Sequence, residues 1–282
     1  MKYVKIIPLF FCCLVLAHVL FAEEKLPPGQ VGVAPNIFEE LHIGSKPVNE
    51  SIRLYNFKEK PITVRVDAHN WTIDEDNKVK LLPPDPQSLD QWLIINPLSF
   101  TVPPKKSQVI RFSIRPRVKP DPGEHRAIIY FTEEKNPEDS TATATLQVLF
   151  RIGVGVYATA DPVRKKGVLH SFKLDGNKKL SADIENTGNV HIRFGGKFAI
   201  WQADTFPGLD NPSKVFPQNK KDKEPPEGYA AGGQLNRFPV LPGARRTITT
   251  ALPRIEKSGT YIIAVKDTLA GTPRSQIFRL TR

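Results

Sequence analysis

The chain has 282 residues and a formal net charge of +11 at pH 7, a length that is enough for two ordinary domains. Both cysteines, Cys12 and Cys13, lie within the first 22 residues, which excludes disulfides and thiol chemistry from the rest of the chain. The 26 prolines, the regular turns and the lack of a long helical pattern indicate an all-β protein.

Residues 1–22 have the layout of a secretory signal peptide. Lys2 and Lys5 precede the apolar run IIPLFFCCLVLAHVL, and Ala22 offers a small residue for cleavage before Glu23. The run is shorter than the roughly 20 apolar residues of a membrane span, and an uncleaved anchor is the alternative. We therefore expect an exported protein that spans no membrane after cleavage. Export argues against nucleic acid as the partner of this basic chain.

Short alternating segments then follow one another up to residue 156. They predict about seven strands, the number typical of an immunoglobulin-like sandwich. The segment SLDQWLI (88–94) fits either a helical turn or the start of a strand. The predicted strands lie in VGVAPNIFEELHI (31–43), SIRLYNF (51–57), ITVRVDAHNW (62–71), LSFTV (98–102), QVIRFSIRP (108–116), GEHRAIIYF (123–131) and a last segment from residue 146.

The second half of the chain repeats the pattern of the first. LPGARRTITTALP (241–253) matches VPPKKSQVIRFSIRP (102–116), since each has a proline turn with basic residues, an alternating strand and a closing proline. We therefore predict two tandem immunoglobulin-like β-sandwiches. The predicted limits are a signal peptide (1–22), an N-terminal domain (23–158), a hinge (159–167) and a C-terminal domain (168–282).

Two further features concern the surface and the cores. The segment 206–234 is rich in proline, glycine and lysine, a composition that predicts an exposed, mobile loop. Trp71, Trp92 and Trp201 are interpreted as core residues rather than as a platform for sugars.

No motif indicates catalysis or metal binding. The histidines are far apart and form no pair with metal-ligand spacing. The stretch IDEDNK lacks the glycine and the closing glutamate of a calcium loop. The glycines of GVGVY lie within a predicted strand, without the helix that a phosphate site needs. We therefore expect a protein that is not an enzyme and has no metal and no cofactor.

The segment that ends the first domain, TATATLQVLFRIGVGVYATA, alternates over an unusual length. From residue 146 to residue 156 it would span roughly 35 Å at the usual rise per residue, whereas most strands have about five or six residues. These side chains could simply fill the core of their own domain, although that alone does not explain the length. The apolar positions are Leu146, Val148, Phe150, Ile152, Val154 and Val156.

Three segments, IRLYNFKEKPITVRVDAHNW, VPPKKSQVIRFSIRP and ATLQVLFRIGVGVY, give the chain a resemblance to the periplasmic pilus-assembly chaperones of chaperone–usher systems, as a divergent member. The resemblance covers roughly residues 31–282. It implies an ATP-independent chaperone that caps pilus or surface-fibre subunits by donor-strand complementation, with an outer-membrane usher as a further partner. By analogy the donated side chains are Leu146, Val148, Phe150, Ile152 and Val154.

One feature of that family is missing. Its members anchor the C-terminal carboxylate of the subunit with an arginine on the first strand and a lysine late in the donor strand. Here APNIFEE (34–40) has no arginine, and the lysine position falls on or near Gly155. Arg151, Arg164 and Lys165 are candidate substitutes. The alternative function is a secreted, tandem immunoglobulin-like structural or adhesion protein whose long strand stays in its own sheet. An exported hydrolase is disfavoured, because no nucleophile–base arrangement is visible.

Overall fold

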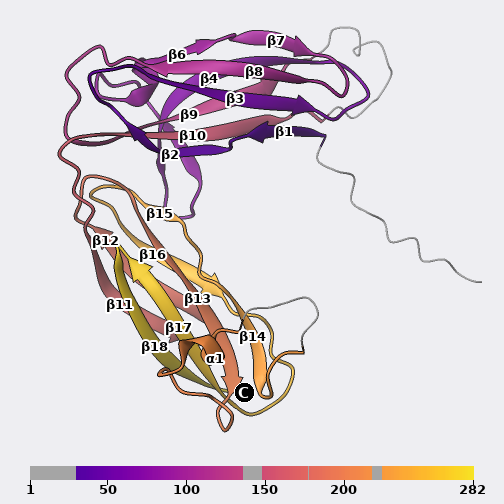
Figure 1. Cartoon of the computed structure of the whole chain (residues 1–282), viewed down its shortest axis with the longest axis vertical. Helices are drawn as coiled ribbons and strands as arrows, with labels where there is room; N and C mark the ends of the chain where they lie inside the picture. Colours follow the sequence, from indigo (N-terminus) through magenta and orange to yellow (C-terminus); the bar gives the residue numbers. More distant parts are fainter. Residues whose placement is uncertain (1–29, 136–147, 177, 218–223) are drawn as a thin grey trace, which may run out of the picture.

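The computed structural model describes residues 30–135, 148–176, 178–217 and 224–282 (Figure 1). The described residues form four β-sheets and only two short helices, of three and four residues, so the predicted all-β fold with two sandwiches is confirmed. Residues 31–160 contribute the two sheets of the first sandwich, and residues 167–281 contribute those of the second. None of the helices among these residues is long and apolar enough to cross a membrane.

The first sandwich packs a four-stranded sheet against a larger one. The first sheet has the strand order β1-β3-β8-β6, and the second has the order β2-β10-β9-β4-β5 with β7 paired to β4. In chain order the elements are β1 (Val31–Ala34), β2 (Ile37–His42), β3 (Val48–Asn56), β4 (Ile62–Ile73), β5 (Val79–Leu82), the short helix η1 (Leu89–Gln91), β6 (Leu93–Asn96), β7 (Ser99–Val102), β8 (Ser107–Ile114), β9 (Gly123–Glu133) and β10 (Arg151–Ala160).

Strands β1 and β2 belong to different sheets, which corrects the prediction of a single strand over residues 31–43. Strand β1 pairs with β3 in antiparallel fashion, whereas β2 pairs with β10 in parallel fashion. Pro35 lies between them, and proline has no N–H group to donate to a ladder. The chain therefore leaves the first sheet at this point and crosses to the other.

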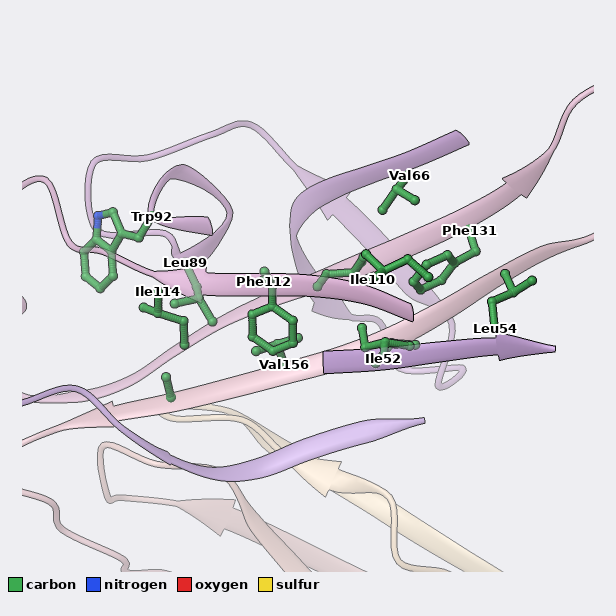
Figure 2. Close-up of a cluster of buried hydrophobic side chains, with 14 of the residues drawn as sticks. Ile52, Leu54, Val66, Leu89, Trp92, Ile110, Phe112, Ile114, Phe131 and Val156 are labelled. Carbon is green, nitrogen blue, oxygen red and sulfur yellow. The ribbon is translucent and has the colours of Figure 1, made fainter. Parts of the chain in front are cut away.

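Alternation along the strands builds the core of the first sandwich (Figure 2). Ile110, Phe112 and Ile114 of β8 point inward and are at most 1% exposed, whereas Arg111 on the same strand is exposed. Segment 88–94 is both a helical turn and the start of a strand, and it places Trp92 at one end of this core. The Nε1–H of Trp92 donates to the carbonyl of Pro86 at 3.0 Å.

The second sandwich contains a three-stranded sheet in the order β11-β12-β16 and a sheet in the order β14-β13-β17-β18, with β15 paired to β13. Its elements are β11 (Gly167–Asp175), β12 (Lys179–Asn186), β13 (Ile192–Gln202), the helix α1 (Pro212–Val215), β14 (Tyr229–Gln234), β15 (Pro239–Val240), β16 (Arg245–Ala251), β17 (Thr260–Leu269) and β18 (Thr272–Thr281).

The prediction of an exposed loop over segment 206–234 holds only in part: residues 206–211 and 224–228 are turns and loop, whereas Pro212–Val215 and Tyr229–Gln234 form helix α1 and strand β14. Helix α1 buries Val215 and Phe216 against Trp201, and the Nε1–H of Trp201 donates to the carbonyl of Val215 at 3.0 Å. Strand β14 then completes one edge of the sheet. The composition did not predict helix α1 and strand β14, because a few apolar residues, spaced among prolines and lysines, are enough to cover the outer face of the sheet. Residues 218–223 lie outside the described residues.

Trp71, Trp92 and Trp201 are 4%, 1% and 3% exposed, so their interpretation as core residues is confirmed. Strand β10 includes Thr159 and Ala160, which the sequence assigned to the hinge, because β9 pairs with it as far as Ala160. The connection between the two sandwiches therefore runs over residues 161–166.

Candidate protein-binding edge of strand β10

The regular part of strand β10 begins later than the alternation predicts. Strand β9 ends at Glu133, whose N–H donates to the carbonyl of Phe150 at 3.0 Å. Val148 and Leu149 lie beyond this last bond and have no regular strand geometry. The predicted strand is too long for this reason: side-chain alternation continues past the point where its neighbour ends. Leu146 lies outside the described residues.

On the side away from β9, β10 has a neighbour over its second half. Strand β2 pairs with it from Gly155 to Thr159, and the N–H of Ile43 donates to the carbonyl of Thr159 at 2.8 Å. Successive residues of a strand turn their backbone groups to opposite sides, so the groups of Arg151 and Gly153 face the same side as those of Thr159. No strand of the described chain pairs with them there, which leaves a free edge.

The apolar face of this segment emerges from the core towards its free end. Val154 and Val156 are fully buried in the core of the first sandwich, and Figure 2 shows Val156 beside Phe112. Ile152 and Phe150 are half-buried, and the ammonium group of Lys58 lies 5.8 Å from the centroid of the Phe150 ring. Val148 is 77% exposed. The protein thus fills its own core with one half of the segment and exposes the other half.

On the outer face of β10, opposite Val154 and Val156, close packing accounts for the two glycines of GVGVY. A Cβ atom on Gly153 would lie 2.6 Å from Cδ1 of Ile128 and 3.0 Å from Cε1 of Tyr130, and one on Gly155 would lie 3.3 Å from the Tyr157 ring. Side chains of β9 and β10 therefore lie across the bare backbone. The glycines serve packing on the outer face of the sheet, in agreement with the absence of a phosphate-binding pattern in the sequence.

The three candidate anchor cations lie at different places. The guanidinium of Arg151 stacks on the Tyr130 ring at 3.9 Å and lies 3.6 Å from the carboxylate of Asp67, on the outer face of the sheet. Arg164 is exposed on the connection between the sandwiches, and Lys165 borders a cleft of about 530 Å³ between them. The structure therefore does not bring Arg151 together with the other two.

Sequence reasoning missed the charged residues of this cleft that meet across the two sandwiches. Arg193 donates to Glu39 and to the carbonyl of Arg237, and His191 contacts Glu124. Glu39 and Glu124 come from the first sandwich, and His191 and Arg193 come from the second. Because the partners are far apart in the sequence, no local spacing could reveal them.

Tyr157 lies at the edge of this charged cluster and is 3% exposed. Its ring contacts those of Trp71 and His191, with centroid distances of 5.8 and 4.6 Å. Burial raises the pKa of Tyr157 to about 12, the carboxylates of Glu124 and Glu39 act in the same direction, and Arg193 opposes them. The phenol is therefore neutral at physiological pH.

The free energy of unfolding is expected to fall as the pH rises from about 10 to about 12. A tyrosine in the unfolded chain loses its proton near the lower value, whereas folded Tyr157 keeps its proton up to the higher one. The stabilisation is thus fully present below pH ~10 and is lost above it, by about 2–3 kcal/mol in total. Urea denaturation across this range measures the loss. Tyr157→Phe should lack this part of the pH dependence, and an identical pH dependence in the variant would contradict the expectation.

The similarity of this chain to known proteins lies in its three-dimensional structure. No family model and no curated protein matches the sequence. The chain is similar to the YadV chaperone, with 12% identity over 89% of this chain and 100% of that one and a TM-score of 0.45. It is also similar to the class 5 fimbriae chaperone CfaA, with 13% identity over 89% of this chain and 98% of that one and a TM-score of 0.45. The E. coli chaperone DraB is similar as well, with 16% identity over 89% of this chain and 95% of that one and a TM-score of 0.43. At this identity the similarity is one of fold alone.

Proposed function

We propose that this protein is a periplasmic chaperone for subunits of a surface fibre, and that it caps a subunit by lending it the first part of strand β10. The observation that carries the proposal is an unpaired strand edge next to exposed apolar side chains. Among the described residues, no strand pairs with Arg151 and Gly153 on the side away from β9, while Val148 is 77% exposed and Phe150 is half-buried. The sequence resemblance to pilus-assembly chaperones agrees with it.

An incoming sheet would use the two sides of this segment differently. Its edge strand would bond to the backbone of Leu149, Arg151 and Gly153, and its groove would receive the side chains of Val148, Phe150 and Ile152. Val154 was also predicted as a donated residue, but in the free protein it is fully buried in the core. Its donation would require the first sandwich to open, so we assign the client-binding role to the segment before it.

The free energy gained by burying these side chains is too small to account for stable binding of a subunit. Burying three such residues contributes roughly 1.5–3 kcal/mol each, which is comparable to the roughly 4–15 kcal/mol that association costs. Backbone hydrogen bonds, at about 0.5–1.5 kcal/mol each, must supply the surplus. Lys165 is the candidate anchor cation that borders the cleft between the sandwiches and could add a contact to a client carboxylate. No nucleotide is required, because release would follow from exchange of one strand for another.

Photo-crosslinking in the native host tests the proposal. A benzophenone amino acid is placed at Val148 or at Phe150, and the captured proteins are identified by mass spectrometry. The matched control position is Ile94, which is 53% exposed on the other sheet of the same sandwich. We expect an exported fibre subunit to be captured from the first two positions and not from the control.

Capture of nothing, or only of a second copy of the chain, would contradict the chaperone function. That outcome would favour the alternative, a secreted structural or adhesion protein. The burial of Val154 and Val156 in their own core is the observation that agrees with this alternative.

A further inference from the structure

Arg246 of strand β16 connects the second sandwich to the turn between β4 and β5 of the first. It is 9% exposed, which is rare for an arginine unless it is paired. One guanidinium nitrogen donates to the carbonyl of Pro239 in its own domain at 2.9 Å. The other donates to the carbonyl of Asp74 at 3.0 Å and to Oδ1 of Asn77, both in the first domain. One side chain thus bridges both sandwiches.

The turn that receives Arg246 is held in shape by its own hydrogen bonds. The N–H of Asp74 donates to the carbonyl of Lys78 at 3.0 Å, and the N–H of Lys78 donates to Oδ1 of Asp74 at 2.8 Å. The N–H of Asn77 donates to the carbonyl of Asp74 at 3.1 Å, and Asn77 has a φ of 65°. Because the backbone of the turn is already held by these bonds, binding of the guanidinium to the Asp74 carbonyl orders little else.

A second set of contacts, to which the Arg193–Glu39 and His191–Glu124 contacts of the charged cleft also belong, joins the sandwiches beside the connection between them. The Nδ2–H of Asn189 donates to the carbonyl of Pro162 at 2.9 Å, and the N–H of Glu124 donates to the carbonyl of Asn189 at 2.8 Å. An open cleft of about 430 Å³ is bordered by Glu124 and Asn189 of this set and by Leu82 of the β4–β5 hairpin, whereas Arg246, Asp74 and Asn77 do not border it. Figure 1 shows the hairpin reaching from the first sandwich towards β15.

We propose that Arg246 is a positioning residue that fixes the angle between the two sandwiches. Contacts beside the connection form one attachment, about which the domains could still rock, and rocking is the usual behaviour of domains whose interface is small and polar. The Arg246 contact with the turn forms a second attachment at a separate place. Two separate attachments remove the rotation that one alone permits. This inference goes beyond the chaperone function and does not depend on it.

Distance measurements between spin labels test the proposal. Cys12→Ser and Cys13→Ser leave the full chain without cysteine, so labels can be placed at Ser51→Cys on β3 and Ser275→Cys on β18, both exposed. Double electron–electron resonance is expected to give a narrow distance distribution for the parent chain. Arg246→Ala should at least double the width of that distribution, and Arg246→Lys should give an intermediate width.

Two matched variants make the result specific. Arg245→Ala removes the neighbouring arginine, which pairs at 2.6 Å with Asp183 of its own sandwich, and should leave the distribution narrow. Asn77→Gly keeps the positive φ of the turn but removes one acceptor, and should broaden the distribution less than Arg246→Ala.

A label pair within one sheet, at Gln234→Cys and Ser275→Cys, reports whether the second sandwich is folded. If Arg246→Ala fails to fold by this criterion, Asn77→Gly decides the matter. An unchanged width in the folded variants, or equal broadening by Arg245→Ala, would overturn the proposal. Because no client takes part, such a result would leave the proposed function of β10 untouched.

Discussion

Replacing Val148 with glutamate is expected to abolish capture of a fibre subunit without changing the stability of the free protein. The side chain is 77% exposed, and substitutions at exposed positions usually change the free energy of unfolding by less than about 0.5 kcal/mol. In the proposed complex the same side chain enters an apolar groove. Loss of its burial and the cost of burying a carboxylate together exceed about 3 kcal/mol, which corresponds to at least a hundredfold weaker binding.

Calorimetric melting of the free variant and titration with the subunit captured by crosslinking measure the two effects. Ile94→Glu is the matched control, because Ile94 is also an exposed aliphatic residue of the first sandwich and should tolerate the charge in both measurements. Phe150→Glu should weaken binding as well, with some loss of stability, since Phe150 is half-buried against the core. A Val148→Glu variant that binds the subunit normally would remove the basis of the proposed donor segment.

Asn56→Ala is expected to destabilise the first sandwich by about 3 kcal/mol, since several buried backbone groups would lose their partners. Asn56 is 0% exposed at the end of β3. Its Nδ2 donates to the carbonyls of Lys60, Val102 and Pro103 at 2.9–3.1 Å, and its Oδ1 accepts from the N–H of Lys58 at 2.9 Å. One side chain therefore holds the turn after β3 against the end of β7. Urea denaturation measures the loss.

The second sandwich repeats this arrangement with Asn186, which is 1% exposed at the end of β12. Its amide donates to the carbonyls of Val190 and Val240 at 2.8 Å, and its Oδ1 accepts from the N–H of Gly188 at 2.9 Å. Asn186→Ala should therefore lower the unfolding transition of the second sandwich. Asn49→Ala, an exposed asparagine of β3, should have little effect. Equal stability losses for Asn49→Ala and Asn56→Ala would show that burial and bonding are not the cause.

The buried asparagine that recurs in both sandwiches shows which features of the internal sequence repeat correspond to structure. The turns that begin at Asn56 and at Asn186 occupy matching places in the two halves, and each asparagine bonds to groups two and four residues further along its own turn. These bonds are local, so their signature survives in a local stretch of sequence, whereas the bonds to Val102 and Val240 reach a distant segment. Contacts between halves, such as Arg193 with Glu39, leave no such signature.

Strand β10 shows that alternation of apolar residues predicts the buried face of a strand but neither its ends nor its neighbours. Alternation correctly identifies the inward face, on which Val154 and Val156 are fully buried. It cannot tell where a neighbouring strand ends, so it predicted strand residues before Arg151, where β10 begins. It also cannot show that the chain changes sheets at Pro35, or that none of the described strands pairs with the outer edge of β10 before Gly155. That unpaired edge is the main feature of the candidate site.

The sequence by itself determined the all-β class, the two repeated sandwiches and the apolar faces of the strands, because each depends on spacing between near neighbours along the chain. Only the tertiary structure decided which strand edges stay free, which charges meet in the cleft, and how Arg246 reaches the turn at Asp74. These features depend on pairing between segments that are far apart in sequence. Backbone hydrogen bonding is the same for all residues except proline, so the sequence pattern of a strand carries little information about its partner.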